Sequence, residues 1–374
     1  MPIDPARMLR SLCEVLNSDV WIGDGPMAKR CEALIREQIG VPHAYLTPSC
    51  TSALEMACVL AGIGHGDEVI MPSFGFSSAG NAVVLRGGVP VFVDVRPDTL
   101  NIDETLVEGA ITRKTKAIIV VHYAGVMCEM PAIYGVVGPQ VLIIEDAAQA
   151  YLSRYQNLAA GTWGDISAFS FHQTKNIRCG EGGALTLPEG GIGDEFATRA
   201  EVLREKGTDR AAFLRGEVQR YTWTDVGFSG VVSEFQAAVL LAQLERAKEI
   251  TERRLALWDR YHHAMTNLDY WGKVRRPTVP PHCQHNGHIY RILLPTQAER
   301  DRILAALNAD GVKASFHFQA LHSAPAGLRY GRVSGSMAVT DSVCGRLLRM
   351  PLSHATTEED VDRAVDRLEK ALRG

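Results

Sequence analysis

The sequence predicts an α/β fold, with a mostly parallel central sheet flanked by helices and a smaller α+β domain at the C-terminus. Short apolar runs alternate with helical stretches from Thr47 onward. Several of these runs are apolar at nearly every position, which is typical of parallel strands buried on both faces of a sheet. The predicted strands are Glu68–Met71, Val89–Val93, Ala117–Val121, Val141–Ile144, Ile166–Phe171 and Ala184–Leu187.

Helical periodicity marks the elements around these strands. Apolar residues recur at helical spacing in two early stretches, 8–16 and 27–35. A long helix is predicted from Ser233 to about Met265, with Phe235, Val239 and Ala242 on one face. These elements form the predicted large domain, residues 1–250, which includes an N-terminal arm.

The remaining residues, 251–374, predict the small α+β domain. After a connector at 277–286, the pattern indicates a strand at 289–294, a helix at 299–307 and a strand at 313–318. The last helix begins at a candidate capping box formed by Thr356 and Glu359. An apolar stripe from Val361 to Leu372 continues that helix.

Composition limits the functional class. The formal net charge of −4 argues against a dedicated nucleic-acid binder, which usually carries a strongly basic surface. No run of 18 apolar residues occurs, and the start has no apolar run behind a basic segment, so neither a membrane span nor a secretory signal is expected. The eight cysteines contain no C-x-x-C pair, which favours reduced thiols and a cytoplasmic location.

Candidate site residues follow four predicted strands at their carboxyl ends, where ligands collect in open α/β sheets. They are Ser73 and Phe76, His122 and Tyr123, Asp146 and Gln149, and Lys175. Lys175 leaves an apolar strand and enters the glycine-rich loop at 180–183. A partly desolvated lysine beside a cofactor is the nucleophile that Schiff-base chemistry requires.

Asp146 adds the second requirement of a pyridoxal-phosphate (PLP) site, because a carboxylate beside the cofactor ring nitrogen keeps that nitrogen protonated. The alternative for Asp146 is a cap on the next turn. A helix predicted to open at 47–54 offers N–H groups and hydroxyls for the phosphate, although Ser and Thr are also common helix caps. Phe76 is placed to cover the ring, and its alternative is a core position.

These residues stand in motifs that resemble the DegT/DnrJ/EryC1/StrS sugar aminotransferases, which have the fold-type I, aspartate-aminotransferase-like fold. The motifs occur in order: T-P-S-C-T-S-A-L, G-D-E-V-I-M-P-S, E-D-A-A-Q and S-F-H-x-T-K-N followed by G-E-G-G-A. The resemblance implies that Lys175 binds PLP and moves protons, with pyridoxamine phosphate as the aminated form. It also implies cofactor-binding roles for Cys50, Thr51, Phe76, Asp146, Gln149, Ser170 and Ser229.

Further stretches, 93–103, 121–126 and 204–223, resemble the subgroup that makes dTDP-4-amino-4,6-dideoxygalactose for surface glycans. Ser229 stands where many family members have an asparagine that reaches the neighbouring subunit's cofactor, and this subgroup also carries serine there. Arginine pairs well with phosphate, so the basic stretch 204–223 is the candidate contact for a sugar-nucleotide diphosphate, with Lys206, Arg215 and Tyr221 as candidate substrate residues.

The resemblance implies amino transfer from L-glutamate to C4 of dTDP-4-keto-6-deoxy-D-glucose by a homodimer with shared active sites. Alternatives are a 4-amino-4,6-dideoxyglucose product, a 3-amino sugar, or a protein that binds PLP or a sugar nucleotide without catalysis. A histidine-rich stretch, 282–288, lacks a carboxylate and helical ligand spacing, so no metal site is expected.

Overall fold

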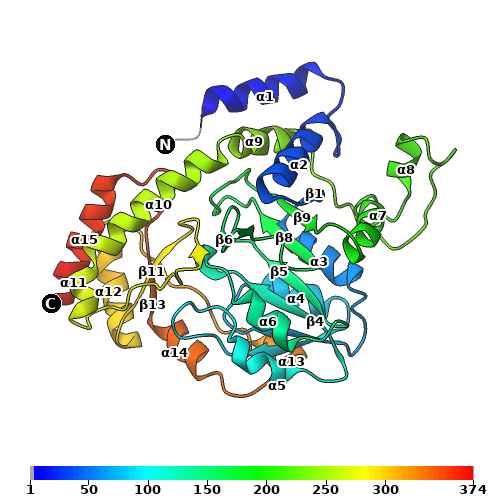
Figure 1. Cartoon of the computed structure of the whole chain (residues 1–374). Coiled ribbons are helices and arrows are strands. Elements are labelled where there is room, and N and C mark those ends of the chain that lie inside the picture. Colours follow the sequence, from blue (N-terminus) through cyan, green and yellow to red (C-terminus); the bar gives the residue numbers. More distant parts are fainter. Residues whose placement is uncertain (1–3, 374) are drawn as a thin grey trace.

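The computed structural model describes residues 4–373. Its centre is an eight-stranded sheet (Figure 1). Six neighbouring strands, β8, β5, β4, β2, β3 and β12, run parallel to one another. β9 pairs antiparallel with β8, and β1 pairs antiparallel with β9 at the end of the sheet. The order is β1 (His43–Thr47), β9 (Gly183–Leu187), β8 (Ile166–Ser170), β5 (Leu142–Asp146), β4 (Thr115–Val121), β2 (Glu68–Pro72), β3 (Val89–Val93) and β12 (Arg332–Val333).

Both faces of this sheet are buried, which explains the nearly continuous apolar strands. Successive side chains of a strand point to opposite faces, so Ile70 joins one hydrophobic cluster and its neighbour Val69 joins the other. The first cluster packs under α1 (Pro5–Asn17), α2 (Pro26–Ile39), α5 (Val107–Ala110), α6 (Met130–Val136) and α9 (Glu234–Leu244). The second packs under α3 (Cys50–Leu60), α4 (Ser77–Val84) and α7 (Ile192–Arg204).

A third hydrophobic cluster lies in the C-terminal part of the chain. It is built by α10 (Ala247–Ala264), α11 (Thr266–Tyr270), β11 (Tyr290–Leu293), α12 (Gln297–Ala309), β13 (Leu347–Met350) and α15 (Glu358–Arg373). β11 and β13 pair antiparallel. The boundary at residue 250 stays a prediction. A fourth cluster joins the two regions, because it includes Phe74 and Tyr123 of the first part together with Leu293 and Leu347 of the second.

Two expectations for this part of the chain are wrong. The helix expected from Ser233 to Met265 is divided into α9 and α10, because Arg246 takes a non-helical backbone conformation between them. The strand expected at 313–318 is an extended segment with a single bridge, from Ser315 to Arg349. The partner of β11 is β13 instead, so the expected strand–helix–strand unit draws its second strand from further along the chain.

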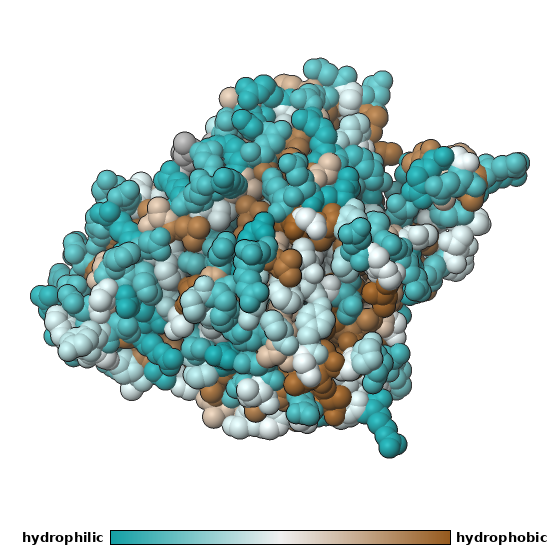
Figure 2. Space-filling model, in the orientation of Figure 1, coloured by the Kyte–Doolittle hydropathy of each residue, from teal (hydrophilic) through white to brown (hydrophobic). Residues whose placement is uncertain are grey.

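The remaining elements are short. They are η1 (Glu104–Leu106), η2 (Tyr123–Gly125), β6 (Arg154–Tyr155), β7 (Leu158–Ala159), α8 (Arg210–Leu214), β10 (Cys283–Gln284), α13 (Pro325–Tyr330) and α14 (Ala338–Arg346). Between residues 4 and 373, no helix is long and apolar enough to cross a bilayer. The face shown in Figure 2 is mostly hydrophilic, with apolar residues scattered among polar ones.

Candidate functional site

Lys175 lies in a loop that leaves β8 at the carboxyl edge of the parallel strands. The loop is closed by backbone hydrogen bonds from Phe171 N to Gly182 O (2.8 Å) and from Gln173 N to Gly180 O (2.7 Å). Gly180 has φ +91°, a conformation that favours glycine. This closed loop holds Lys175 beside the ends of β5 and β8.

The Lys175 amine is prepared to act as a nucleophile. Burial lowers its pKa, and the guanidinium of Arg349 lowers it further, whereas Cys50 and Asp146 oppose the shift. Burial also raises the pKa of the Cys50 thiol, so Asp146 is the opposing negative charge near neutral pH. A lowered pKa increases the fraction of neutral amine, which is the form that attacks a carbonyl carbon.

Asp146 is the last residue of β5 and is only 6% exposed. Its Oδ1 accepts a hydrogen bond from Ala148 N at 3.1 Å, so the capping alternative is correct for one oxygen. Its Oδ2 accepts no hydrogen bond from any residue in the described range 4–373. Burial raises the pKa of Asp146, and the Ala148 N–H and Lys175 oppose that rise. This oxygen, free on a carboxylate that is otherwise largely buried, fits the protonated ring nitrogen of PLP.

A buried pair lies behind Asp146. His122 Nε2 is 2.8 Å from Glu145 Oε2, and both side chains are fully buried. Glu145 also accepts hydrogen bonds from the backbone N–H groups of Gly161, Trp163 and Gly164 and from the Ser167 hydroxyl. His122 Nδ1 accepts the Cys128 N–H, so Nε2 carries the proton that bonds Glu145. His122 therefore supports the carboxyl end of β5 from inside the core.

The first turn of α3 provides a site for the cofactor phosphate. Ser49 caps the helix by accepting the Ser52 N–H at 3.0 Å. The N–H groups of Cys50 and Thr51 donate to no other described residue, as is usual in the first turn of a helix. A helix start with free N–H groups favours a phosphate group. The Thr51 hydroxyl lies 2.7 Å from that of Ser78.

Gly183 brings Ser170 to this helix start. It pairs with Ser170 on one side and with Thr47 on the other. A Cβ atom on Gly183 would lie only 2.5 Å from Cys50 N, so the strand and the helix start touch through a position that has no room for a side chain. The predicted phosphate residues Cys50, Thr51 and Ser170 are thus brought together.

Gln149 and Phe76 lie at the same edge of the sheet. Gln149 is buried, and its Oε1 accepts the Ala124 N–H at 2.8 Å, which fixes the side chain after β5. Phe76 precedes α4 and is 61% exposed, so the core alternative for this residue is wrong. Its ring centroid is 6.3 Å from that of Phe318. An exposed ring at a strand end is free to cover a planar ligand.

The predicted substrate residues lie apart from these groups, on an arm that comprises residues 205–229. The arm contains α8 and projects from the body beside α7 (Figure 1). Arg215 donates to Glu201 and Glu217, and Lys206 Nζ is 4.0 Å from Glu205. Tyr221 packs against Phe213. Within residues 4–373, no hydrogen bond, ion pair or ring contact joins Lys206, Arg215, Tyr221 or Ser229 to the Lys175 site.

The arm carries exposed apolar side chains among hydrophilic ones (Figure 2). Leu214 is 64% exposed and Trp223 is 78% exposed. Ser229 is exposed and forms an isolated bridge with Glu205 at the base of the arm. Exposed aromatic and aliphatic side chains on a projecting segment are typical of a protein interface.

Sequence reasoning missed three residues of this cleft: Arg349, His317 and Asn176. Arg349 is on β13, where its backbone exchanges two hydrogen bonds with Ser315. Its half-buried guanidinium makes no hydrogen bond to a described residue, and no carboxylate of residues 4–373 lies within ion-pair distance of it. The sequence feature that could have indicated Arg349 as a site residue is its position inside the otherwise apolar run Leu347–Met350.

His317 and Asn176 complete the surroundings of Lys175. His317 Nδ1 is 3.0 Å from the hydroxyl of Tyr123, one of the predicted residues. Burial lowers the pKa of His317 to about 2, with further contributions from Arg349 and Lys175. Asn176 follows Lys175, and its Oδ1 lies 2.9 Å from His288 Nδ1. Neutral histidines and an arginine without a carboxylate partner among residues 4–373 therefore lie close enough to Lys175 to act on its charge.

Comparisons with known proteins agree with this geometry. The sequence model of the DegT/DnrJ/EryC1/StrS aminotransferase family matches residues 3–369. The spore coat polysaccharide biosynthesis protein SpsC of Bacillus subtilis is 32% identical over 383 residues, covering 100% of this chain and 96% of SpsC.

Solved structures are similar over the whole chain. The aminotransferase TlmJ of Streptoalloteichus hindustanus has a TM-score of 0.88 and 30% identity, with 98% of this chain and 96% of TlmJ covered. DesI, crystallised in the presence of its TDP-sugar product, has a TM-score of 0.87 and 28% identity, with 100% of this chain and 91% of DesI covered.

Proposed function

Because the chain belongs to the DegT/DnrJ/EryC1/StrS aminotransferase family, we propose that it transfers the amino group of L-glutamate to C4 of dTDP-4-keto-6-deoxy-D-glucose. The protein is a PLP-dependent sugar aminotransferase, so the non-catalytic alternative is wrong. The proposed product is dTDP-4-amino-4,6-dideoxy-D-galactose, made in the cytoplasm for a surface glycan. The single observation that carries the proposal is the partly buried Lys175 amine, whose pKa is lowered by burial and by Arg349, a shift that the charge of Asp146 opposes.

The proposed roles of the residues follow from their positions. Bound PLP supplies an electron sink that stabilises a carbanion. Asp146 Oδ2 holds the proton of the ring nitrogen, and the N–H groups of Cys50 and Thr51 with the Ser170 hydroxyl hold the phosphate. Gln149 would border the ring, and Phe76 would exclude water from one of its faces. Lys175 Nζ accepts a proton from the donor carbon and returns one to sugar C4.

Arg349 supports an acidic amino donor. A guanidinium that has no carboxylate partner in a half-buried cleft is suited to binding a carboxylate in a bidentate manner. L-Glutamate has two carboxylates, and one of them at Arg349 would direct the α-amino group toward Lys175. The neutral Tyr123–His317 pair beside Arg349 offers further hydrogen bonds without adding negative charge that would repel the donor.

Two further observations support the proposed identity of the sugar and of its nucleotide. DesI, a relative of similar length, was crystallised with a TDP-sugar product. The stretch 204–223, which resembles the subgroup that makes the galacto product, forms most of the projecting arm. We propose that the arm of one chain reaches the active site of a second chain in a homodimer, so that Lys206, Arg215, Tyr221 and Ser229 meet substrate or cofactor there.

One experiment tests the reaction and its product. The PLP-loaded enzyme is incubated with L-glutamate and dTDP-4-keto-6-deoxyglucose, 2-oxoglutarate is measured, and the purified sugar is examined by NMR. The expected product has an axial C4 amine, as in galactose. An equatorial amine would overturn the galacto assignment, and an amine at C3 would overturn the position of transfer. Sedimentation velocity of the same sample gives the mass of the assembly.

A further inference from the structure

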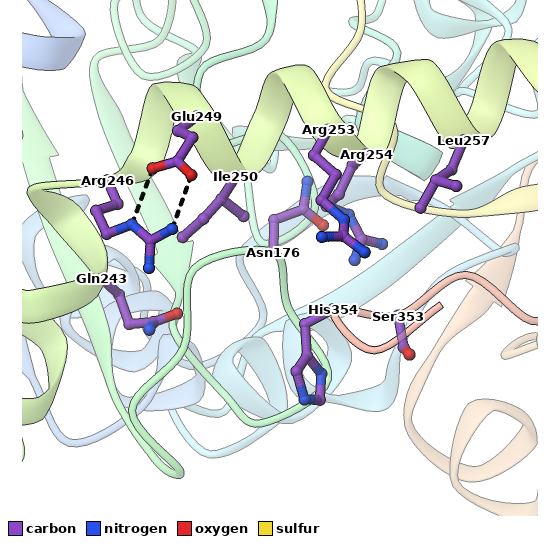
Figure 3. Close-up of a pocket in the computed structure, with 10 residues that line it drawn as sticks. All are labelled: Asn176, Gln243, Arg246, Glu249, Ile250, Arg253, Arg254, Leu257, Ser353 and His354. Atoms are coloured by element: carbon purple, nitrogen blue, oxygen red, sulfur yellow. Dashed lines mark hydrogen bonds and ion pairs between the residues drawn. The ribbon is translucent and has the colours of Figure 1, made fainter. Parts of the chain in front are cut away.

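A second cavity lies on the side of α10, separate from the cofactor cleft (Figure 3). The space between its lining side chains, with the adjoining open solvent included, is about 470 Å³. Arg253 and Arg254 extend from α10 toward Asn176, and Ser353 and His354 lie on the loop across from them. Asn176 is the only lining residue that neighbours Lys175 in sequence. None of the proposed phosphate residues of the cofactor lines this cavity.

The cavity has an excess of positive charge. Its lining contains three arginines and a single carboxylate, that of Glu249. Glu249 accepts two hydrogen bonds from Arg246, at 2.9 and 2.7 Å. Within residues 4–373, no carboxylate lies within ion-pair distance of Arg253 or Arg254. The charges of these two arginines are therefore balanced by no side chain of the described part of the chain.

Arg254 is held rigidly in place. It is 5% exposed and donates to the carbonyl oxygens of Gly287 (3.1 Å), His288 (2.6 Å) and Leu352 (3.2 Å). Burial, with smaller contributions from the charges of Arg178 and Arg349, lowers its pKa to about 10. Carbonyl dipoles satisfy its N–H groups without neutralising its charge. A buried charge without a counter-ion is costly, which an anion in the cavity would relieve.

Two further groups face the same space. His354 Nδ1 is buried and has no hydrogen-bond partner among the described residues. Burial lowers the pKa of His354, and the charges of Arg178, Arg254 and Arg253 lower it further, which shows that all three guanidinium groups act on this ring. Arg253 donates through Nη2 to Thr356 O at 3.1 Å, and its Nη1 makes no hydrogen bond to a described residue.

We propose that this cavity is a second anion-binding site, which takes a phosphoryl-type oxyanion between Arg253, Arg254 and His354, with the charge of Arg178 acting from outside the lining. A single carboxylate would leave one of the charges of Arg253 and Arg254 unbalanced, whereas a phosphoryl dianion matches both. The several oxygens of such a group also suit the two arginines and the imidazole that line the cavity. The ligand is either free phosphate or the diphosphate of a nucleotide substrate, which share this chemistry.

The test measures binding of inorganic phosphate to the PLP-loaded enzyme by isothermal titration calorimetry, with the cofactor's own phosphate site already filled. The expected result is saturable binding of one phosphate per chain. Arg253→Gln keeps a donor for Thr356 O but removes the charge, and we expect it to weaken binding by about tenfold. The double variant Arg178→Gln/Arg253→Gln should weaken it further.

Lys248→Gln is the matched control, because it removes one positive charge from the solvent-facing side of the same helix. It should leave phosphate binding unchanged. Circular dichroism melting of each variant shows that the fold is retained. Arg254 is not substituted, because its three carbonyl contacts make it a structural residue as well.

A parallel titration with dTDP distinguishes the two sources. Displacement of phosphate by dTDP, together with weaker dTDP binding in Arg253→Gln, assigns the site to the nucleotide diphosphate. Unchanged dTDP binding with weakened phosphate binding assigns it to free phosphate. The proposal is overturned if phosphate does not bind saturably, or if Arg253→Gln and Lys248→Gln bind it equally. It is also overturned if Arg253→Gln only dissociates the assembly, since a partner's carboxylate would then fill the cavity.

Discussion

Lys175 and Arg349 place two positive groups in one cleft, although they lie on a loop after β8 and on β13, far apart in the sequence. Burial lowers the pKa of the Lys175 amine, and the charge of Arg349 lowers it further. Asp146 opposes this shift on the lysine side, whereas Arg349 has no carboxylate partner among residues 4–373 and suits an added anion. An acidic amino donor is such an anion, so the arginine that binds the donor would also tune the lysine that reacts with it.

The first prediction concerns this pair. Replacing Arg349 by glutamine should raise the KM for L-glutamate by about tenfold or more, because a charge-assisted hydrogen bond to the donor is lost. The KM for the sugar should change far less. Because removal of a nearby cation raises the pKa of Lys175, the acid limb of the pH–rate profile should shift to higher pH. Arg275→Gln, an exposed arginine of the same region, is the control. Equal changes in both KM values would contradict donor binding by Arg349.

The second prediction concerns Lys175 itself. Lys175→Ala should reduce 2-oxoglutarate formation by about 10⁴-fold, because the proton carrier and the covalent attachment are both lost. PLP should then be removable by dialysis, which absorbance spectroscopy measures. Lys248→Ala, at an exposed position on α10, should keep full activity. Substantial turnover by the Lys175 variant would require another base in the cleft.

Asp146→Asn tests the ring-nitrogen contact with little change in shape. The amide oxygen can still accept the Ala148 N–H, but the side chain no longer carries the negative charge that keeps the ring nitrogen protonated. We expect kcat to fall by about 10²- to 10³-fold, while the melting temperature stays close to that of the wild type. Retention of full kcat would show that another group protonates the ring.

Glu145→Gln is expected to destabilise the fold. The carboxylate accepts hydrogen bonds from three backbone N–H groups, Ser167 and His122, and an amide group would direct its own N–H groups at some of these donors. The loss should be roughly 2–4 kcal/mol in the free energy of unfolding, measured with urea. Glu108→Gln, which changes an exposed glutamate on α5, should cost less than about 0.5 kcal/mol.

The same carboxylate predicts a direction for the pH dependence of stability. Burial alone would raise the pKa of Glu145, but hydrogen bonds from His122 and the backbone hold it below its ordinary value. Its contribution is therefore complete above the unfolded pKa of about 4.3 and is lost as the pH falls through the folded value. Urea unfolding between pH 7 and pH 3 should show a smaller acid-induced loss of stability in Glu145→Gln than in the wild type.

The large sheet and its site could be predicted largely because burial on both faces leaves a clear mark. Strands such as Ile166–Ser170 and Leu142–Asp146 are buried along almost their whole length and end in a polar residue, and parallel strands bring those ends to one edge. Asp146 and Lys175 were found in this way. The short strand β1 was not predicted, because it is recognised only by its antiparallel pairing with β9, in which Thr47 lies opposite Gly183.

The C-terminal part was less predictable for physical reasons. The break between α9 and α10 occurs at Glu245 and Arg246, without glycine or proline, so packing rather than local preference divides the helix. The segment 313–318 has the composition of a strand, but β13 is the one that pairs with β11. Arg349 was not predicted as a site residue, because the pairing of β13 with β11 decides its position and hydrophobic periodicity does not reveal that pairing.

The two-residue strand β12 has a consequence for synthesis on the ribosome. It pairs with β3, so residues 332–333 cover an edge that was formed by residues 89–93. Until the ribosome has released almost the whole chain, β3 remains an open edge able to recruit another nascent chain. A fragment that ends near residue 250 would keep that edge open permanently, and aggregation in the cell would be its expected fate.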